Sequence, residues 1–443
     1  MTSRAAADRL PVLLSPGPEG GAGEQRWGGP FAAPLTYLVF GLVDILVFGI
    51  HAHGSVTFSF TPEFAKVSVP NLVLPAAGTA TLCGAVTIAL AAVRLLEVLG
   101  IVRLGRSGRV WRRVIVGVVL FAFIIALLAW AGGGQTIPFN VVNLLSGTLD
   151  ASIPIMLGAL TGVICSTSGV INIAIEGQLL LGAFCAAIAT SVTGSLWLGL
   201  ICGALAGSLV GILLALFAIA YRVDQVVLGV VLNTLVLGLT GYLYNAIMVP
   251  YGDTLNSPNT FNPYKIPLLG DIPIIGPVFF DATIFLYITY IALAGVQIGL
   301  TRTRWGLRTR AVGEHPVAAD TVGIRVLAYR YRNVIGSGLI AGIGGAYFTI
   351  GSVGSFGPDM SSGEGYIALA AMIFGRYTPF GAVGAALLFG FTTQLQSVLG
   401  SINVPIQSNL LLLTPYVVTI IVVAGLVGKV RGPRAEGVPY VKS

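Results

Sequence analysis

Long apolar runs separated by short polar segments make up most of this chain. A transmembrane helix needs about 20 mostly apolar residues. On that basis we predict spans near 34–50, 72–100, 114–131, 141–165, 170–192, 196–220, 226–249, 283–300, 333–351, 380–399 and 410–428. The apolar piece at 366–375 is too short to span and predicts a half-helix or re-entrant element, which needs surrounding protein or a cavity. The pattern predicts an all-α, polytopic integral membrane protein with about 11 transmembrane helices.

Composition indicates a lipid bilayer, rather than water, as the solvent of this chain. Hydrophobic residues make up 55% of the 443 residues and charged residues 9%, whereas a soluble domain carries roughly 25% charged residues. The cysteines are Cys83, Cys165, Cys185 and Cys202. They lie in or beside apolar runs without a CxxC pair, so the pattern favours neither a disulfide framework nor a metal site.

The net charge of +7 comes from arginines that cluster in particular loops. They gather at 103–113, 302–332 and 431–434, whereas the loops at 51–71 and 250–282 hold one lysine each. The positive-inside rule then predicts that the arginine-rich loops and both termini are cytoplasmic. Because the charge follows membrane topology, nucleic acid is not expected as a partner. Loop 250–282 is either a linker or a contact for an external partner.

These boundaries predict four segments. Residues 1–33, rich in Gly, Pro and Ala, form a disordered cytoplasmic tail without the apolar core of a signal peptide. Residues 34–139 form an N-terminal extension of three spans. Residues 140–428 form the main transmembrane domain, with a cytoplasmic loop at 301–332, and residues 429–443 form a cytoplasmic C-terminal tail.

The loop at 301–332 is too long for a hairpin turn, and its centre predicts a short helix between Glu314 and Gly323. Pro316 suits the first turn of a helix, and Gly323 suits its C-terminal end. Such a helix, held in the cytoplasm by two spans, is either a docking element for a soluble partner or a solvated loop helix. Composition leaves both interpretations open.

Several stretches together resemble one transporter family. They are "SGVINIAIEGQLLLGAF" (168–184), "QVVLGVVLN" (225–233), "GLRTRAVGEHPVAADTVGI" (306–324), "GEGYIALAAMIFGRYTPFGAVGAALLFG" (363–390) and "GVPYVK" (437–442). They are similar to the branched-chain amino acid, simple-sugar and nucleoside permeases of ABC importers, and most of all to the nucleoside-type branch. The resemblance covers roughly 140–443, so the first 140 residues have no assigned role.

The resemblance implies a permease subunit in the bacterial cytoplasmic membrane that moves a small solute by alternating access. It favours a nucleoside, with simple sugars or branched-chain amino acids as alternatives. It also implies an ABC ATPase, a second and non-identical permease subunit and an extracytoplasmic lipoprotein receptor of the basic-membrane-protein type as partners in the lipid bilayer. The loop helix resembles a coupling helix. ATPase contact is therefore expected at Glu314, His315, Pro316, Ala318, Ala319, Asp320 and Gly323.

ATP hydrolysis is expected in a partner rather than in this chain. The sequence has no G-x-x-x-x-G-K-[ST] phosphate loop, because "GLVGKV" at 425–430 lacks the spacing and the hydroxyl residue. ATP and magnesium would bind the partner ATPase, with no cofactor here. An intramembrane enzyme is disfavoured because His51 and His53 lie at a membrane edge and His315 lies in the cytoplasmic loop.

Polar residues inside predicted spans are candidates for the translocation path, because charge in the bilayer is costly and commonly functional. Asn172 and Glu176 are four residues apart and would share one face of a helix. Gly177 beside Glu176 indicates a helix break near a cavity, where Gln178 adds a second polar group. Asn233 interrupts another apolar span. Each of these polar residues either lines the path or forms an interhelical hydrogen bond.

Two further patterns bear on mechanism. "EGQLLLGA" from Glu176 and "EGYIALAA" from Glu364 resemble each other, which is typical of inverted repeats with discontinuous helices at a transport site. The rival function, an ion-coupled secondary transporter, would use Asp44, Asp150 and Glu176 as proton or cation sites.

The sixth predicted span carries a glycine every fourth residue, at Gly199, Gly203, Gly207 and Gly211. Glycines at this spacing form a smooth ridge along one helix face. Such a ridge lets another helix approach closely, so we expect these glycines to serve packing.

Overall fold

The computed structural model describes residues 31–61, 69–102, 108–135, 138–402 and 431–441. Contacts divide the chain into one unit within Met1–Val56 and Val73–Thr136, and another within Thr57–Leu72 and Ile137–Ser443. The described residues contain ten helices that are long and apolar enough to cross a membrane. The all-α, multi-pass membrane fold is therefore confirmed. The predicted span at 410–428 and the tail before residue 31 lie outside the described residues.

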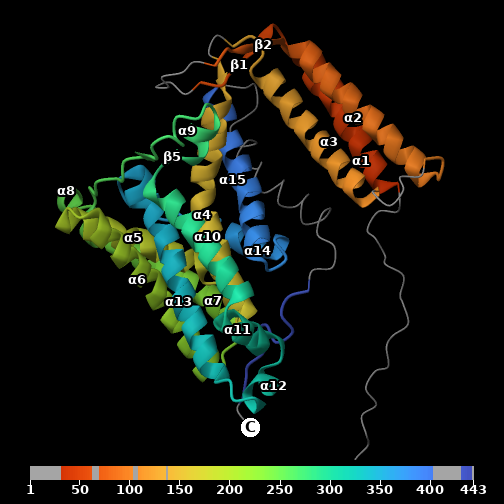
Figure 1. Cartoon of the computed structure of the whole chain (residues 1–443). Helices are drawn as coiled ribbons and strands as arrows, with labels where there is room; N and C mark the ends of the chain where they lie inside the picture. The colour runs from red at the N-terminus through yellow and green to blue at the C-terminus, as the bar shows by residue number, and fades with distance from the viewer. Residues whose placement is uncertain (1–30, 62–68, 103–107, 136–137, 403–430, 442–443) are drawn as a thin grey trace, which may run out of the picture. The chain divides into compact units, whose positions relative to one another are not determined.

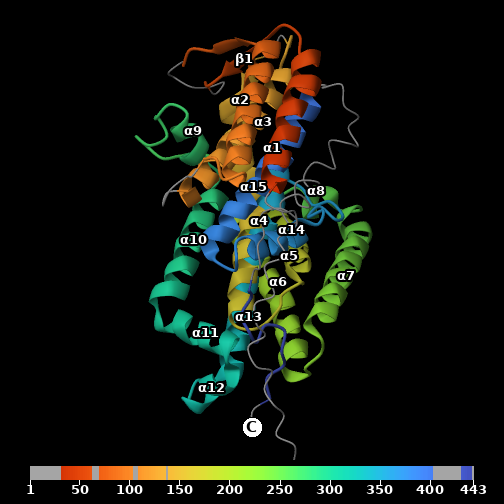
Figure 2. The same cartoon turned by 90° about the vertical axis from the view of Figure 1, so that its right-hand side faces the viewer.

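The first unit is a bundle of three apolar helices that lie side by side in both views (Figures 1 and 2). Its elements are α1 (Ala32–Val43), the π-helix η1 (Asp44–Gly49), β2 (Leu72–Pro75), α2 (Ala76–Val98) and α3 (Gly108–Ala131). Phe48, Ala80 and Ala126 form one of its buried apolar clusters. The span predicted at 72–100 begins later, at Ala76. Proline disfavours helical geometry in the residue before it, so Leu74 stays extended and the helix starts only after Pro75.

The second unit is built around α4, a helix that is buried along nearly its whole length. Its spans are α4 (Val141–Thr167), α5 (Ile175–Thr193), α6 with η2 (Leu196–Ala215, Leu216–Ala220), α7 with η3 (Gln225–Leu243, Tyr244–Met248), α10 (Ile284–Arg302), α13 with η4 (Val326–Ala346, Tyr347–Val353) and α15 (Pro379–Ser401). Helices α13, α14 and α15 pack against α4. Strand β1 (Ser55–Ser59) pairs in parallel with β3 (Phe139–Asn140).

Short elements occupy the two ends of this unit. They are α8 (Gly252–Leu255), β4 (Tyr264–Lys265), α9 (Ile275–Phe279), β5 (Asp281–Ala282), α11 (Arg304–Glu314), α12 (Pro316–Thr321) and α14 (Glu364–Phe374). Strands β4 and β5 pair antiparallel. Helices α11 and α12 lie at one end of the unit and α9 at the other (Figures 1 and 2). The predicted half-helix is confirmed as α14, whereas α11 is an additional helix that the sequence pattern did not predict.

The glycine ridge of α6 packs against glycines of α13, as predicted. A Cβ atom added at Gly207 would meet the Gly338 carbonyl oxygen and would lie 2.6 Å from the Gly342 Cα. Gly203 likewise lies against Ala346 and the carbonyl oxygen of Gly182 on α5. These contacts bring the backbones of α6 and α13 together at a distance that only glycine permits.

Gly207→Ala should therefore destabilise the protein. The added methyl group collides with backbone atoms that cannot rotate away, which typically costs about 1–3 kcal/mol. Gly238→Ala on α7 is the matched control, because its Cβ would meet nothing within 4 Å. Thermal unfolding of the detergent-solubilised variants tests this. An unchanged melting temperature for Gly207→Ala would contradict the close packing.

Candidate functional site

The N-terminal ends of α5 and α14 meet inside the second unit. Glu176 lies in the first turn of α5 and Glu364 begins α14. Gly365 lies so close to Glu176 that an added Cβ would overlap the backbone nitrogen of Glu176. Helix N-termini carry unpaired N–H groups and partial positive charge. The meeting point therefore attracts carboxylates and other hydrogen-bond acceptors.

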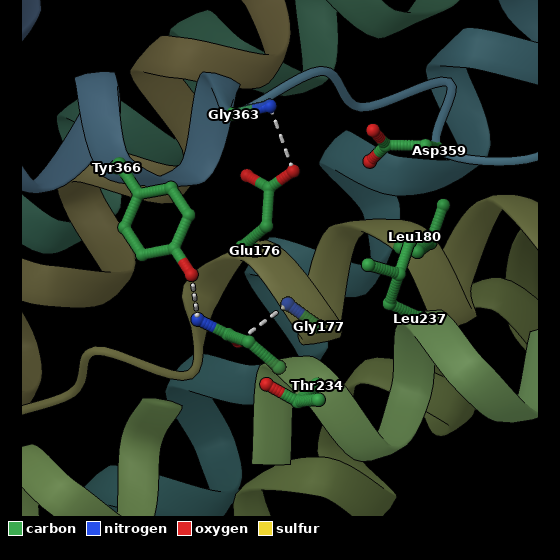
Figure 3. A pocket seen from close by; sticks show the side chains of 9 residues that line it. Glu176, Gly177, Leu180, Thr234, Leu237, Asp359, Gly363 and Tyr366 are labelled. Atoms are coloured by element: carbon green, nitrogen blue, oxygen red, sulfur yellow. Dashed lines mark hydrogen bonds between the residues drawn. The ribbon is translucent and has the colours of Figure 1, made fainter. Parts of the chain in front are cut away.

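The carboxylate of Glu176 caps the N-terminus of α14. Its Oε1 accepts a hydrogen bond from Gly363 N at 2.9 Å (Figure 3). The same oxygen accepts one from Ser361 Oγ at 2.6 Å, and Oε2 accepts one from Gly365 N at 2.6 Å. The residue at the N-cap of α14, Gly363, has φ +84° and no side chain of its own to supply a cap. Glu176 is only 7% exposed, so these charge-assisted bonds fix α14 to α5.

Asn233 of α7 holds the beginning of α5 in a similar way. Its Oδ1 accepts a hydrogen bond from Gly177 N at 2.8 Å, and its Nδ2 donates to the Tyr366 hydroxyl at 3.0 Å (Figure 3). Its Nδ2 also donates to Ile173 O at 2.9 Å. One amide thus joins α7 to both helix ends. Asn233 forms interhelical hydrogen bonds and also lines a cavity beside them.

Asn172 and Gln178 pair with each other in the buried core. Asn172 Nδ2 donates to Gln178 Oε1 at 3.1 Å, and neither residue lines the cavity. The expectation that Asn172 and Glu176 share one helix face is wrong, because α5 begins only at Ile175. Gly169, with φ +85°, follows the end of α4 and turns the chain out of helical geometry.

A cavity of about 250 Å³ lies beside the two helix ends. Its lining consists of Glu176, Gly177, Leu180, Asn233, Thr234, Leu237, Asp359, Gly363 and Tyr366 (Figure 3). Leucine side chains from α5 and α7 form its apolar part, whereas acidic, amide and phenol groups form its polar part. Such a mixture is typical of pockets that bind small molecules with both apolar and polar surface.

Asp359 is the cavity residue that sequence reasoning missed and that stands out chemically. Its side chain is exposed, and within the described ranges no hydrogen bond or ion pair engages its carboxylate. The polar "GPDMSSGEG" (357–365) before the half-helix was the available signal. Thr234 and Tyr366 were missed as well, although Tyr366 lies inside a motif quoted for the resemblance.

Of the three acids considered for ion coupling, Glu176 is the one that lines the cavity. Asp44 is fully buried but belongs to the first unit, and Asp150 on α4 does not line the cavity. Within the described part of the chain, no group of three or more His, Cys, Asp or Glu residues could hold a metal ion.

The predicted helix in the cytoplasmic loop is confirmed as α12. Pro316 occupies its first turn, and Gly323 has φ +82°. Gly323 N donates to Asp320 O at 2.9 Å and Ile324 N donates to Ala319 O at 3.0 Å. This pair of bonds is the Schellman arrangement that ends helices at a left-handed glycine.

The residues expected to contact an ATPase differ in how exposed they are. Glu314, His315, Ala318 and Gly323 are exposed, Pro316 and Asp320 are half-buried, and Ala319 is buried. The exposed apolar side chains are Val317 at 56% and Val322 at 74%, which sequence reasoning did not single out. Together they give α12 an apolar outer surface.

Comparisons with known proteins agree with this architecture. Residues 143–426 match the family described as the branched-chain amino acid transport system / permease component. The guanosine ABC transporter permease protein NupQ of Bacillus subtilis is 41% identical over 321 residues, which cover 68% of this chain and 99% of the relative. The nucleoside ABC transporter permease protein NupC of Lactococcus lactis is 39% identical over 69% of this chain and 99% of the relative.

A more distant relative is the putative glucose ABC transporter permease protein TsgC13 of Haloferax volcanii, 33% identical over 60% of this chain and 80% of its own length. No solved structure matches the chain significantly. The chain belongs to the branched-chain amino acid transport system permease family. It is thus an ABC transporter permease with multiple membrane-spanning helices.

Glu176→Gln should lower the stability of the protein. The amide offers one acceptor oxygen where the carboxylate has two, so at least one buried donor of α14 loses its partner, at a cost of about 1–3 kcal/mol. Thermal unfolding in detergent measures this. Asp359→Asn is the matched control at the same cavity, because it breaks no protein hydrogen bond and asparagine tolerates the positive φ of +55°. Equal melting temperatures for the two variants would refute the capping role.

Proposed function

We propose that this protein is the transmembrane permease of an ATP-driven nucleoside importer, with the cavity at the α5–α14 junction as its solute contact. The observation that carries this proposal is a mixed polar and apolar cavity between discontinuous helix ends, in a chain of the ABC permease family. Transport sites of membrane carriers are typically built at such helix ends. The names of the two most similar relatives cited above support a nucleoside over a sugar.

The chemistry of the cavity fits a nucleoside. A nucleoside has a flat base, which can pack against the Tyr366 ring and Leu237, and a ribose with hydroxyl donors. Asp359 offers a free carboxylate acceptor for such donors, whereas most of the acceptor capacity of Glu176 is taken by α14 and the turn before it. Among the predicted path residues, Glu176 and Asn233 border the solute, and Asn172 and Gln178 support them from the core.

The two ends of the second unit support the proposed partners. An ABC ATPase, which binds ATP and magnesium, docks on α12 through Val317, Val322 and the exposed residues between Glu314 and Gly323. A lipoprotein receptor delivers solute to the opposite end, which carries the 250–282 connection, in the bacterial cytoplasmic membrane. A second, non-identical permease subunit completes the path. Both termini are cytoplasmic in this arrangement.

Transport then proceeds by alternating access. ATP-driven closure of the ATPase displaces α12, and the helix ends around Glu176 and Asn233 change which side of the membrane the cavity faces. The hydrogen bonds that Glu176 and Asn233 form keep α5, α7 and α14 together during this movement.

Asp359→Asn should slow nucleoside transport by about tenfold, the loss expected when a charged acceptor for the solute is replaced by an amide. Uptake of radiolabelled guanosine by proteoliposomes with the complete transporter and saturating receptor measures this. Gly238→Ala on α7, whose added Cβ meets nothing within 4 Å, should transport normally. Wild-type rates for Asp359→Asn would remove the cavity from the solute path.

The same preparation tests the solute class. The complete wild-type transporter should take up guanosine in an ATP-dependent manner, whereas glucose and leucine should neither enter nor compete. Uptake of glucose or leucine instead would overturn the nucleoside assignment. Uptake by the isolated chain in an ion gradient without ATP would support the ion-coupled rival.

Val322→Asp should weaken ATPase binding by about tenfold or more, because a charge in the apolar centre of an interface is costly. The ATPase retained on the affinity-purified permease measures this binding. Leu268→Asp is the matched control, because Leu268 is 85% exposed in the 250–282 connection, at the opposite end of the unit from α12. Full ATPase retention by Val322→Asp would exclude α12 as the docking surface.

A further inference from the structure

The C-terminal segment 431–441 is fastened along the end of the second unit that carries α11 and α12. The deep-blue trace in Figure 1 runs beside these helices. Its hydrogen bonds reach three separate parts of the fold: Ala435 N donates to Gly313 O at 2.8 Å, Gly437 N to Gly169 O at 3.2 Å, and Arg330 Nη1 to Val438 O at 2.9 Å. The family-like motif "GVPYVK" begins at the second of these contacts.

One end of this segment packs against the buried side of α12, the proposed docking helix. Tyr440 is 8% exposed and packs in a buried cluster with Val312, Ala319 and Val326. Its hydroxyl interacts with the carboxylate of Asp320 on α12. Because Ala319 is the buried residue of α12, displacement of that helix would also displace Tyr440.

A second part of the segment fixes the base of the docking loop. Glu314 ends α11, and its Oε2 accepts a hydrogen bond from Arg434 N at 3.0 Å. Together with the bond from Ala435 N to Gly313 O, this ties two consecutive residues of the segment to the end of α11.

The same segment also contacts the connection that leads from α4 to the cavity. A Cβ added at Gly437 would lie 2.8 Å from Ile171 Cδ1, and one at Gly169 would lie 3.1 Å from Ala435 O. Both Gly169 and Ile171 lie in the connection that ends at α5, whose first turn contains Glu176. The contact therefore reaches the short stretch of chain that positions the capping carboxylate.

A fourth contact reaches the chain beyond α14. Gly432 lies against the Tyr377 ring, with an added Cβ 3.0 Å from Tyr377 Cζ. Burial raises the pKa of the nearby Glu436 carboxyl, and hydrogen bonds with Ser166 and Tyr377 oppose that shift. The segment thus touches the chain after the half-helix as well as the chain before α5.

Arg330 shows how firmly the segment is held. Its side chain is 2% exposed, and the carbonyl oxygen of Val438 is the one hydrogen-bond acceptor recorded for its guanidinium among the described residues. A buried guanidinium that loses its acceptor carries a large desolvation cost. This cost opposes separation of the segment from α13.

We propose that residues 431–441 transmit movement of the docking helix α12 to the α4–α5 connection, and through it to the helix ends at the cavity. Gly437, Arg330 and Tyr440 act as positioning residues in this link. The inference rests on the proposed docking of the ATPase on α12. The end of α11 also abuts Thr167 directly through Gly313. The C-terminal segment differs in that it contacts α12, the α4–α5 connection and Tyr377 together.

The test is the number of guanosine molecules taken up per ATP hydrolysed by the complete transporter in proteoliposomes. A chain lacking residues 431–443 should retain its ATPase but show a ratio about tenfold lower, within the usual range of coupling between two sites. Loss of stability alone would reduce the amount of active complex and leave this ratio unchanged.

Two matched glycine variants keep the test decisive if the shortened chain does not assemble. Gly437→Ala places a Cβ on a residue with φ +75°, where it is strained and also collides with Ile171. Gly194→Ala places a Cβ on a residue with φ +68°, where it is strained but meets no atom within 4 Å. A lower ratio in Gly437→Ala alone supports the proposal, and equal ratios in the two variants overturn it. Loss of the ATPase from Val322→Asp, with normal coupling in Gly437→Ala, would sustain the docking proposal and reject this one.

Discussion

The carboxylate of Glu176 at the N-terminus of α14 is the interaction on which the centre of this permease depends. A helix that begins inside a membrane protein has N-terminal N–H groups that neither lipid nor its own turns can pair with. Glu176 accepts hydrogen bonds from two of these N–H groups and from a serine hydroxyl. The half-helix can therefore begin in the protein interior. Asn233 likewise accepts a hydrogen bond from an N–H group in the first turn of α5. Without these two side chains, the helix ends beside the cavity would have buried, unpaired donors.

Two acidic residues at the cavity differ in what they can do: one caps a helix, and the other has a carboxylate free to accept hydrogen bonds. Because α14 and the turn before it donate three hydrogen bonds to Glu176, that residue chiefly holds α14 and α5 together, although it borders the cavity. The free acceptor is Asp359, on the loop that leads into α14. The proposed solute contact is therefore a loop residue close to Ser361 and Gly363, which donate hydrogen bonds to Glu176. On this proposal, a change at Glu176 is expected to affect both stability and transport, whereas a change at Asp359 is expected to affect transport alone.

Close backbone packing allows the rest of the unit to act as a stiff frame. The glycines of α6 and α13 bring these helices together without intervening side chains, which leaves little room for independent sliding. On the proposed mechanism, we expect movement in the connections between helices, and above all in the stretch between α4 and α5. The C-terminal segment lies against that stretch and against α12 at the same time. It is thus placed between the element proposed to receive force and the element that bounds the cavity.

Local rules in the sequence determined the spans, the half-helix and the short helix of the cytoplasmic loop. Hydrophobic length specifies a membrane helix, and Pro316 and Gly323 mark the two ends of α12, because these effects act within a few residues. The sequence also identified Glu176 and Asn233 as unusual, since polar groups in apolar runs need partners. It could not name those partners, because Ser361 is 185 residues away from Glu176. Tertiary structure alone decided that Asn172 lies outside α5, that Asp359 faces the cavity and that the C-terminal segment reaches Gly169. Each depends on which distant segments fold together, and no local pattern records that.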